Sequence, residues 1–164
     1  MKITAWLASA LAAFGAALLP ACDAVNLPEI KPGLTTAAEV RARMGNPGFE
    51  FSNDDGSVTW EYSRQPNGTN CYMITIGRDQ IVEKMEQVLT EANFARLRDG
   101  MSRQEVRRRL GAPASQTVFD NLGEDIWEWR VAGMPVMDET YFMVHFDLAG
   151  GGLKKTSRRV VAKG

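Results

Sequence analysis

The residues with the greatest capacity for chemistry in this sequence are few and lie far apart in the chain. His145 is the only histidine, and Cys22 and Cys71 are the only cysteines. Catalysis and metal binding need several such groups within reach of one another. The sequence has no closely spaced pair of histidines or cysteines and no Gly-x-Ser-x-Gly motif. We therefore predict no metal site, no cofactor and no enzymatic activity.

Two glutamates provide the enzymatic alternative, a hydrolase that uses Glu61, Glu128 or His145. Glu61 lies in Trp-Glu-Tyr and Glu128 in Trp-Glu-Trp, and paired carboxylates are the groups that glycoside hydrolysis requires. Because both occur at the same place in a repeat, we expect them in separate parts of a sheet, on the polar side of amphipathic strands. A pair of Cys71 and His145 is also conceivable, since they fall in equivalent strands, but it has no third orienting group.

The N-terminus predicts export and lipidation. Lys2 is followed by an almost wholly apolar run, which is typical of a signal peptide over residues 1–21. The run is short for a membrane span, which takes about 20 residues. Leu-Pro-Ala-Cys, ending at Cys22, resembles the bacterial lipobox, whose cysteine is lipidated; an ordinary signal peptide or a membrane anchor is the alternative. Cys71 would then be the one remaining thiol, and we expect it to be a small buried hydrophobic residue.

The balance of charge excludes one class of partner. Residues 23–90 contain 6 Lys and Arg against 10 Asp and Glu, whereas residues 91–164 contain 12 against 10. A nucleic-acid-binding domain would show a strongly basic face with interleaved aromatic residues. Neither half has that composition, so we predict no nucleic acid partner.

A short helix pattern occurs twice, 66 residues apart. Each copy has a capping hydroxyl, a glutamate three residues later, two apolar residues four apart, a glycine and a proline: Thr36, Glu39, Val40, Met44, Gly45 and Pro47, then Ser102, Glu105, Val106, Leu110, Gly111 and Pro113. The hydroxyl and the glutamate form a capping box, and the glycine ends the helix. The pattern therefore predicts two similar helices, each with one buried face.

The strands after the helices repeat as well. Residues 60–62 recur at 127–129, and residues 72–76 recur as residues 142–146, with the alternation of a strand that has one buried face. The fold class predicted is α+β, with two tandem units in which short helices cover one face of an antiparallel sheet of three or four strands. A linker over 22–32 precedes units at 33–89 and 90–164. The second unit gains a helix from Glu91 to Arg98, and the two sheets could join side by side.

These residues carry a resemblance to a known family. The string G-M-S-x-x-E-V-x-x-x-L-G-x-P, the Trp-Glu-Trp strand and the Val-His-Phe-Asp strand ending at Asp147 resemble the BamE/SmpA/OmlA lipoproteins. The tandem arrangement resembles the β-lactamase-inhibitor-protein fold. The resemblance implies an envelope lipoprotein that binds proteins as an accessory factor in β-barrel outer-membrane protein assembly or envelope integrity. An inhibitor-like module that binds a periplasmic enzyme is the alternative.

The resemblance also bears on partners and location. It implies an envelope protein partner, such as a barrel-assembly subunit, and attachment to the membrane through the N-terminal lipid, facing the periplasm. The family favours the outer membrane. Asp23, directly after the lipobox cysteine, resembles the signal that retains lipoproteins at the inner membrane of enteric bacteria.

Two surfaces are candidates for binding a partner. If alternate residues of the strands over 72–76 and 142–146 lie beneath the helices, Tyr141, Met143, His145 and Met73 line the opposite, open face. Loops or the other unit could instead cover that face. The second helix carries the other candidates, Arg103 and Arg107 with two further arginines, which could meet lipid headgroups or an acidic partner or remain solvated.

Overall fold

The capping pattern of the sequence starts both principal helices of the computed structural model, which describes residues 26–133 and 138–162. These helices are α2 (Ala37–Met44) and α4 (Arg103–Leu110), and both contain the complete capping box. The glycine after each helix has positive φ, 79° at Gly45 and 78° at Gly111. The predicted signal peptide, Cys22 and Asp23 lie outside the described residues.

Two antiparallel meanders follow the helices. The first sheet has the order β1 (Phe49–Ser52), β2 (Val58–Ser63), β3 (Cys71–Ile76) and β4 (Val82–Gln87). The second has the order β5 (Ser115–Phe119), β6 (Glu124–Val131), β7 (Glu139–Asp147) and β8 (Leu153–Val161). The α+β class with two tandem units is therefore confirmed. The two sheets remain separate and do not join edge to edge.

The extra helix of the second unit is shorter than predicted. It forms as α3 (Glu91–Phe94), with Thr90 accepting a hydrogen bond from the Asn93 N–H. The N–H groups of Arg96 and Leu97 then bond to the carbonyl three residues back, in the tighter pattern common at helix ends. Leu97 is nevertheless buried, as the apolar pattern predicts. Two single-turn segments, η1 (Leu27–Glu29) and η2 (Asp120–Leu122), complete the described elements.

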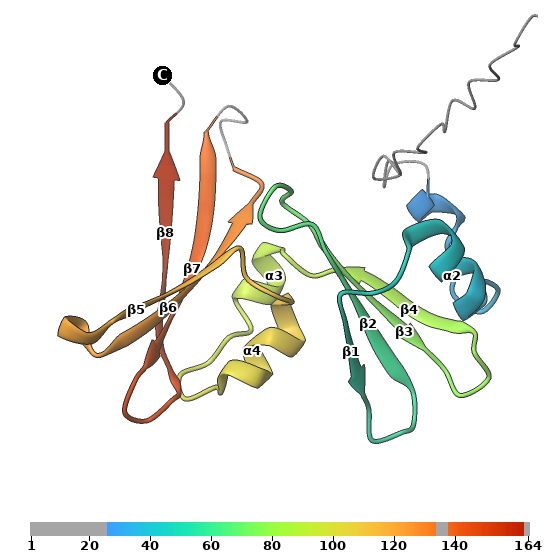
Figure 1. The fold of residues 1–164 in the computed structure, drawn as a ribbon, viewed down its shortest axis with the longest axis horizontal. Coiled ribbons are helices and arrows are strands. Elements are labelled where there is room, and N and C mark those ends of the chain that lie inside the picture. The colour runs from blue at the N-terminus through green and yellow to red at the C-terminus, as the bar shows by residue number, and fades with distance from the viewer. Residues whose placement is uncertain (1–25, 134–137, 163–164) are drawn as a thin grey trace, which may run out of the picture.

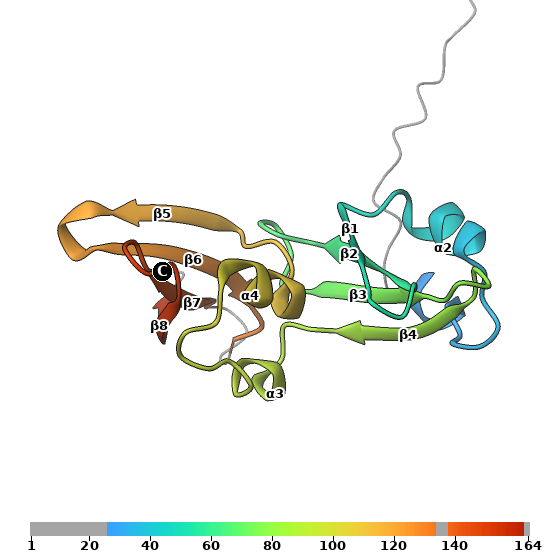
Figure 2. The same ribbon diagram turned by 90° about the horizontal axis from the view of Figure 1, so that it is seen from below.

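The helices cover the sheets unequally. Helix α2 packs Val40 on one face of the first sheet, against Trp60 and Ile74. Helix α4 lies between the two sheets in both views (Figures 1 and 2). Its residues Val106 and Leu110 are fully buried in a cluster that contains aromatic side chains of the second sheet together with Phe51, Cys71 and Met73 of the first. The larger core of the molecule is thus shared by both units.

One repeated glycine has acquired a second role from this packing. A Cβ atom at Gly111 would overlap Sγ of Cys71, whereas a Cβ at Gly45 would have no atom within 4 Å. Both glycines have the positive φ that costs an ordinary residue about 1–2 kcal/mol. Only Gly111 also allows one unit to approach the other closely.

The variants Gly45→Ala and Gly111→Ala separate these two roles. Both should lose stability through the backbone, and Gly111→Ala should lose about 1–3 kcal/mol more because the methyl group overpacks the junction. Urea unfolding of both variants measures the difference. Replacing Cys71 by Gly in the Gly111→Ala background should restore part of the loss, and equal losses in the two single variants would contradict the assignment.

Candidate functional site

Glu61 and Arg107 form a polar contact within the junction of the units. Glu61 is 2% exposed, its Oε1 accepts a hydrogen bond from the Ala112 N–H at 3.2 Å, and its Oε2 lies 3.5 Å from Nε of Arg107. The Arg107 guanidinium also lies over the Phe49 ring, 4.4 Å from its centroid. Glu61 was predicted on the polar side of an amphipathic strand, and the structure shows that the second unit buries it there.

Two more of the predicted partner-binding residues, Met73 and Arg103, also make contacts within the protein. Met73 is buried at the junction and does not line an open face. Arg103 forms an ion pair with Asp125 at 2.7 Å, donates to the Gly151 carbonyl and lies over the Phe146 ring. Arg103 and Arg107 therefore hold the second unit together and join it to the first, and a partner would meet only their exposed portions.

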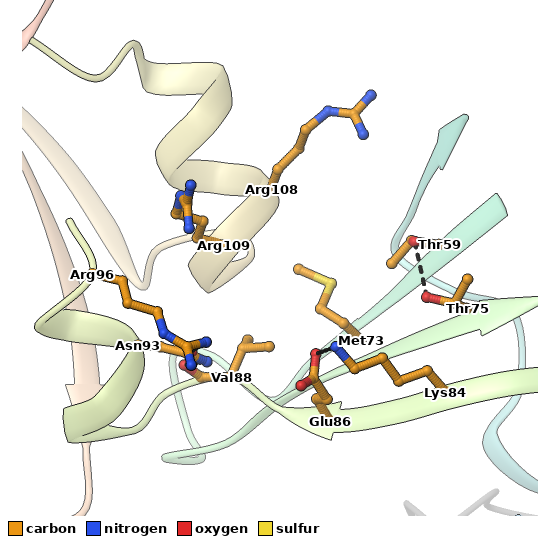
Figure 3. A pocket seen from close by; sticks show the side chains of 10 residues that line it. All are labelled: Thr59, Met73, Thr75, Lys84, Glu86, Val88, Asn93, Arg96, Arg108 and Arg109. Atoms are coloured by element: carbon orange, nitrogen blue, oxygen red, sulfur yellow. Dashed lines mark hydrogen bonds and ion pairs between the residues drawn. The ribbon is translucent and has the colours of Figure 1, made fainter. Parts of the chain in front are cut away.

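A positively charged cavity of about 280 Å³ lies beside the junction (Figure 3). Arg96 and Arg109 line it from the second unit, and Lys84 and Glu86 line it from β4 of the first. Lys84 and Glu86 are paired at 2.7 Å, while Figure 3 shows Arg108 pointing away from the other two arginines. The lining has more cationic than anionic groups, so this cavity suits an acidic group.

The face of the second sheet opposite the helices carries the remaining candidates. Tyr141, Met143 and His145 alternate with the helix-facing residues of β7, as the sequence predicts. Met143 helps to line a hollow of about 250 Å³ on this face, together with Thr117, Phe119, Ile126 and Glu128. Phe142, Val144 and Phe146 face the opposite way, into the shared core. The structure therefore places Met73 apart from the other three residues.

His145 forms two hydrogen bonds with residues that the sequence analysis did not single out. Its Nδ1 lies 2.8 Å from Oε2 of Glu124, and its Nε2 lies 2.8 Å from Oγ of Ser157. The hydrogen bond to His145, aided by Lys155 and Lys154, lowers the pKa of Glu124 to about 2 against the opposing effect of burial. Both partners are diagonal neighbours of His145, on β6 and β8, so only the strand register reveals them.

The catalytic pairs considered from sequence are not assembled. Glu61 faces α4 from the first sheet, whereas Glu128 lies on the far side of the second sheet and pairs with Arg159. Cys71 packs at the junction, away from the face that holds His145. Burial and the charge of Glu61 raise the pKa of the Cys71 thiol to about 12, so Cys71 is not a reactive thiolate. Cys71 is the small buried residue that the sequence predicts.

One edge of the open face lacks the usual protection against pairing. Edge strands commonly carry charges that prevent another strand from adding. Of the four edge strands in the described sheets, β1, β4 and β8 contain charged residues, whereas β5 (Ser115–Phe119) contains none. Every residue of β5 is exposed, and Val118 and the nearby Leu122 are each 56% exposed. This edge can accept an extended segment of another chain.

Fold and surface together define a small two-unit helix and sheet protein in which one sheet face has no helix over it. Residues 86–150, from the end of β4 through β7, match the family model described as the outer membrane protein assembly factor BamE domain. The predicted resemblance to BamE is therefore confirmed for the second unit. A comparison with the curated proteins gave no match.

Similar solved structures have low sequence identity. A suspected beta-lactamase inhibitor protein from Streptococcus mutans is 12% identical, with a TM-score of 0.31 over 76% of this chain and 82% of that one. A DUF4309 family protein from Bacillus subtilis is 12% identical, with a TM-score of 0.30 over 82% of each chain. An extracellular protein with an SCP domain from Bacillus anthracis is 10% identical, with a TM-score of 0.32 over 84% of this chain and 45% of that one.

The described residues contain neither a helix suited to crossing a membrane nor a cluster of side chains suited to binding a metal ion. No helix within residues 26–133 or 138–162 combines the length and apolar character needed to cross a membrane. In the same ranges, no three His, Cys, Asp or Glu side chains are grouped so that they could hold a metal ion.

Glu61 and Glu128 give a matched test of the junction, because the repeat makes them equivalent while the structure does not. Glu61→Ala should cost about 2–4 kcal/mol, since it leaves the Ala112 N–H and the Arg107 guanidinium without their buried partner. Glu128→Ala should cost about 1 kcal/mol or less. Chemical denaturation measures both, and similar losses would show that Glu61 is not a junction residue.

Proposed function

We propose that this protein is an envelope lipoprotein that binds proteins as an accessory factor in the assembly of β-barrel outer-membrane proteins. The match of residues 86–150 to the BamE domain supports this role. The observation that carries the proposal within the structure is the open face of the second sheet, with its hollow and its uncharged β5 edge. No catalytic step is required for this role.

The binding surface combines side chains with backbone groups. Phe119 and Met143 offer apolar contacts around the hollow, and Tyr141 lies further along the same face. The outer side of β5 presents N–H and C=O groups that no strand of the described sheet pairs, and only an extended chain satisfies such a row. A partner that adds a strand to β5 could therefore place alternate side chains in or near the hollow. The partner is then an envelope protein with an accessible extended segment.

A photo-crosslinking residue at Phe119 tests this surface in intact cells. Capture of a barrel-assembly subunit from Phe119, and not from the exposed control position Leu34 in the first unit, would support the proposal. Val118→Lys places a charge on the edge and should lower capture at least tenfold, while changing stability by about 0.5 kcal/mol or less because the side chain is exposed. Val160→Lys, on the charged edge strand β8, is the matched control and should have little effect.

The outcomes of this experiment separate the alternatives. Consistent capture of one soluble periplasmic enzyme from Phe119 would favour the inhibitor-like alternative. Equal capture from Phe119 and Leu34, or full capture by the Val118→Lys variant, would refute the assignment of this face.

Lipid attachment at Cys22 is a separate part of the proposal. It would hold the protein on the periplasmic side of a membrane, with the family favouring the outer membrane and Asp23 favouring the inner one. Cys22→Ala should release the protein from membranes and abolish labelling by palmitate. Sucrose-gradient separation of the two membranes gives the location of the lipidated form, and a Cys22→Ala protein that stays bound and labelled would refute lipidation.

A further inference from the structure

The hydrogen bonds of His145 fix which of its ring nitrogens carries the proton. The Glu124 carboxylate can only accept hydrogen bonds, so Nδ1 of His145 is the donor at the 2.8 Å contact. In the neutral ring Nε2 then has a free lone pair, and the Ser157 hydroxyl at 2.8 Å donates to it. This is the arrangement in which a base activates a serine while a carboxylate orients the base.

We propose that Ser157, His145 and Glu124 form a nucleophilic relay that cleaves a carboxylic ester with an apolar acyl group. Ser157 is the nucleophile, His145 the general base, and Glu124 a positioning residue. This activity goes beyond the accessory role proposed above. Its reacting residues lie on β6, β7 and β8, and it does not require strand addition at β5, although the hollow that would hold the acyl group is also lined by Thr117 and Phe119 of β5.

The surroundings of Ser157 suit such a substrate. Met143 pairs with Ser157 across β7 and β8, and Ile126 pairs with His145 across β6 and β7. Both Met143 and Ile126 line the hollow of about 250 Å³, so the hollow adjoins the cross-strand neighbours of the relay and can take an apolar acyl group. Lys155 and Arg159, two residues on either side of Ser157, lie on the same face of β8. Lys155 already pairs with Glu124 at 3.3 Å and Arg159 with Glu128 at 3.2 Å, and the remaining donors of these two cations can stabilise the oxyanion that forms.

The reaction balances with water as the only co-reactant. Oγ of Ser157 bonds to the carbonyl carbon as its proton passes to Nε2 of His145. The C–O bond to the alcohol then breaks, and Nε2 returns the proton to the departing oxygen. Water next gives a proton to Nε2 and bonds to the acyl carbon, and the same proton returns to Oγ as the acyl bond breaks. The products are an alcohol and a carboxylic acid, with Ser157 restored.

A fluorophosphonate probe and p-nitrophenyl butyrate test the relay on the full chain in detergent. The probe should label one serine per chain, which peptide mapping identifies as Ser157. Ser157→Ala should abolish labelling, and His145→Ala should slow it about 10²-fold or more, the usual contribution of a general base. Ser57→Ala is the control, because the Ser57 hydroxyl also donates to a carboxylate, Asp55 at 2.7 Å, and it should leave labelling and ester hydrolysis unchanged.

The histidine itself gives a readout that does not depend on activity. His145 is the only histidine of the chain, so its ring ¹⁵N signals in the NMR spectrum are unambiguous. In the neutral form of the ring they should place the proton on Nδ1. Glu124→Gln should move that proton toward Nε2 and slow labelling about 10²-fold, while a merely structural glutamate would leave the tautomer unchanged.

Three results would overturn the relay. These are labelling of Ser157→Ala at the wild-type rate, modification of another serine in the wild type, and a neutral His145 ring that carries its proton on Nε2. The NMR result applies even if a variant fails to fold, because it is measured on the wild-type chain.

Discussion

The structure depends on one helix that serves both units. Helix α4 has the usual apolar stripe for the second sheet, but it also lies against the far face of the first sheet, where Phe51, Cys71 and Met73 join the core that surrounds Val106 and Leu110. The apolar residues of α4 are thus buried by both sheets. We therefore expect the junction to tolerate little change, because the Gly111 backbone lies directly against Cys71 and Glu61 reaches across to Arg107 and the Ala112 N–H.

The shared helix determines where a partner can bind. One face of the first sheet is covered by α2, and α4 covers part of the other around Phe51, Cys71 and Met73, leaving the charged cavity beside β4. The second sheet has its helices on one side only, and no helix or sheet among the described residues covers the other. Phe119 of β5, the hollow and the His145 cluster therefore gather on one surface. The two units have similar folds but different roles: the first supports the junction, and the second carries the sheet face that a partner could reach.

Structural features that depend on neighbours in the chain were predicted most reliably from the sequence. The capping boxes, the helix-ending glycines and the alternation of β7 follow from local hydrogen bonding and period, and all were predicted. The placement of Tyr141, Met143 and His145 on the side of β7 opposite the helix-facing residues was predicted in the same way. The open-face position of Met73 and the length of α3 were wrong, and the burial of Glu61 was not predicted. Met73 and Glu61 are buried by the other unit, and alternation shows that two faces exist but does not show what covers each one.

The His145 cluster is a site that the sequence alone could not predict. Glu124 and Ser157 carry no recognisable spacing relative to His145, and they meet it only because the register of β6, β7 and β8 makes them diagonal neighbours. The sequence by itself determined two capped helices, two sheets and their buried faces, since these depend on contacts within a few residues. The tertiary structure decided that one helix is shared, which face stays open and which polar groups meet, because those outcomes depend on how the two units pack and how their strands align.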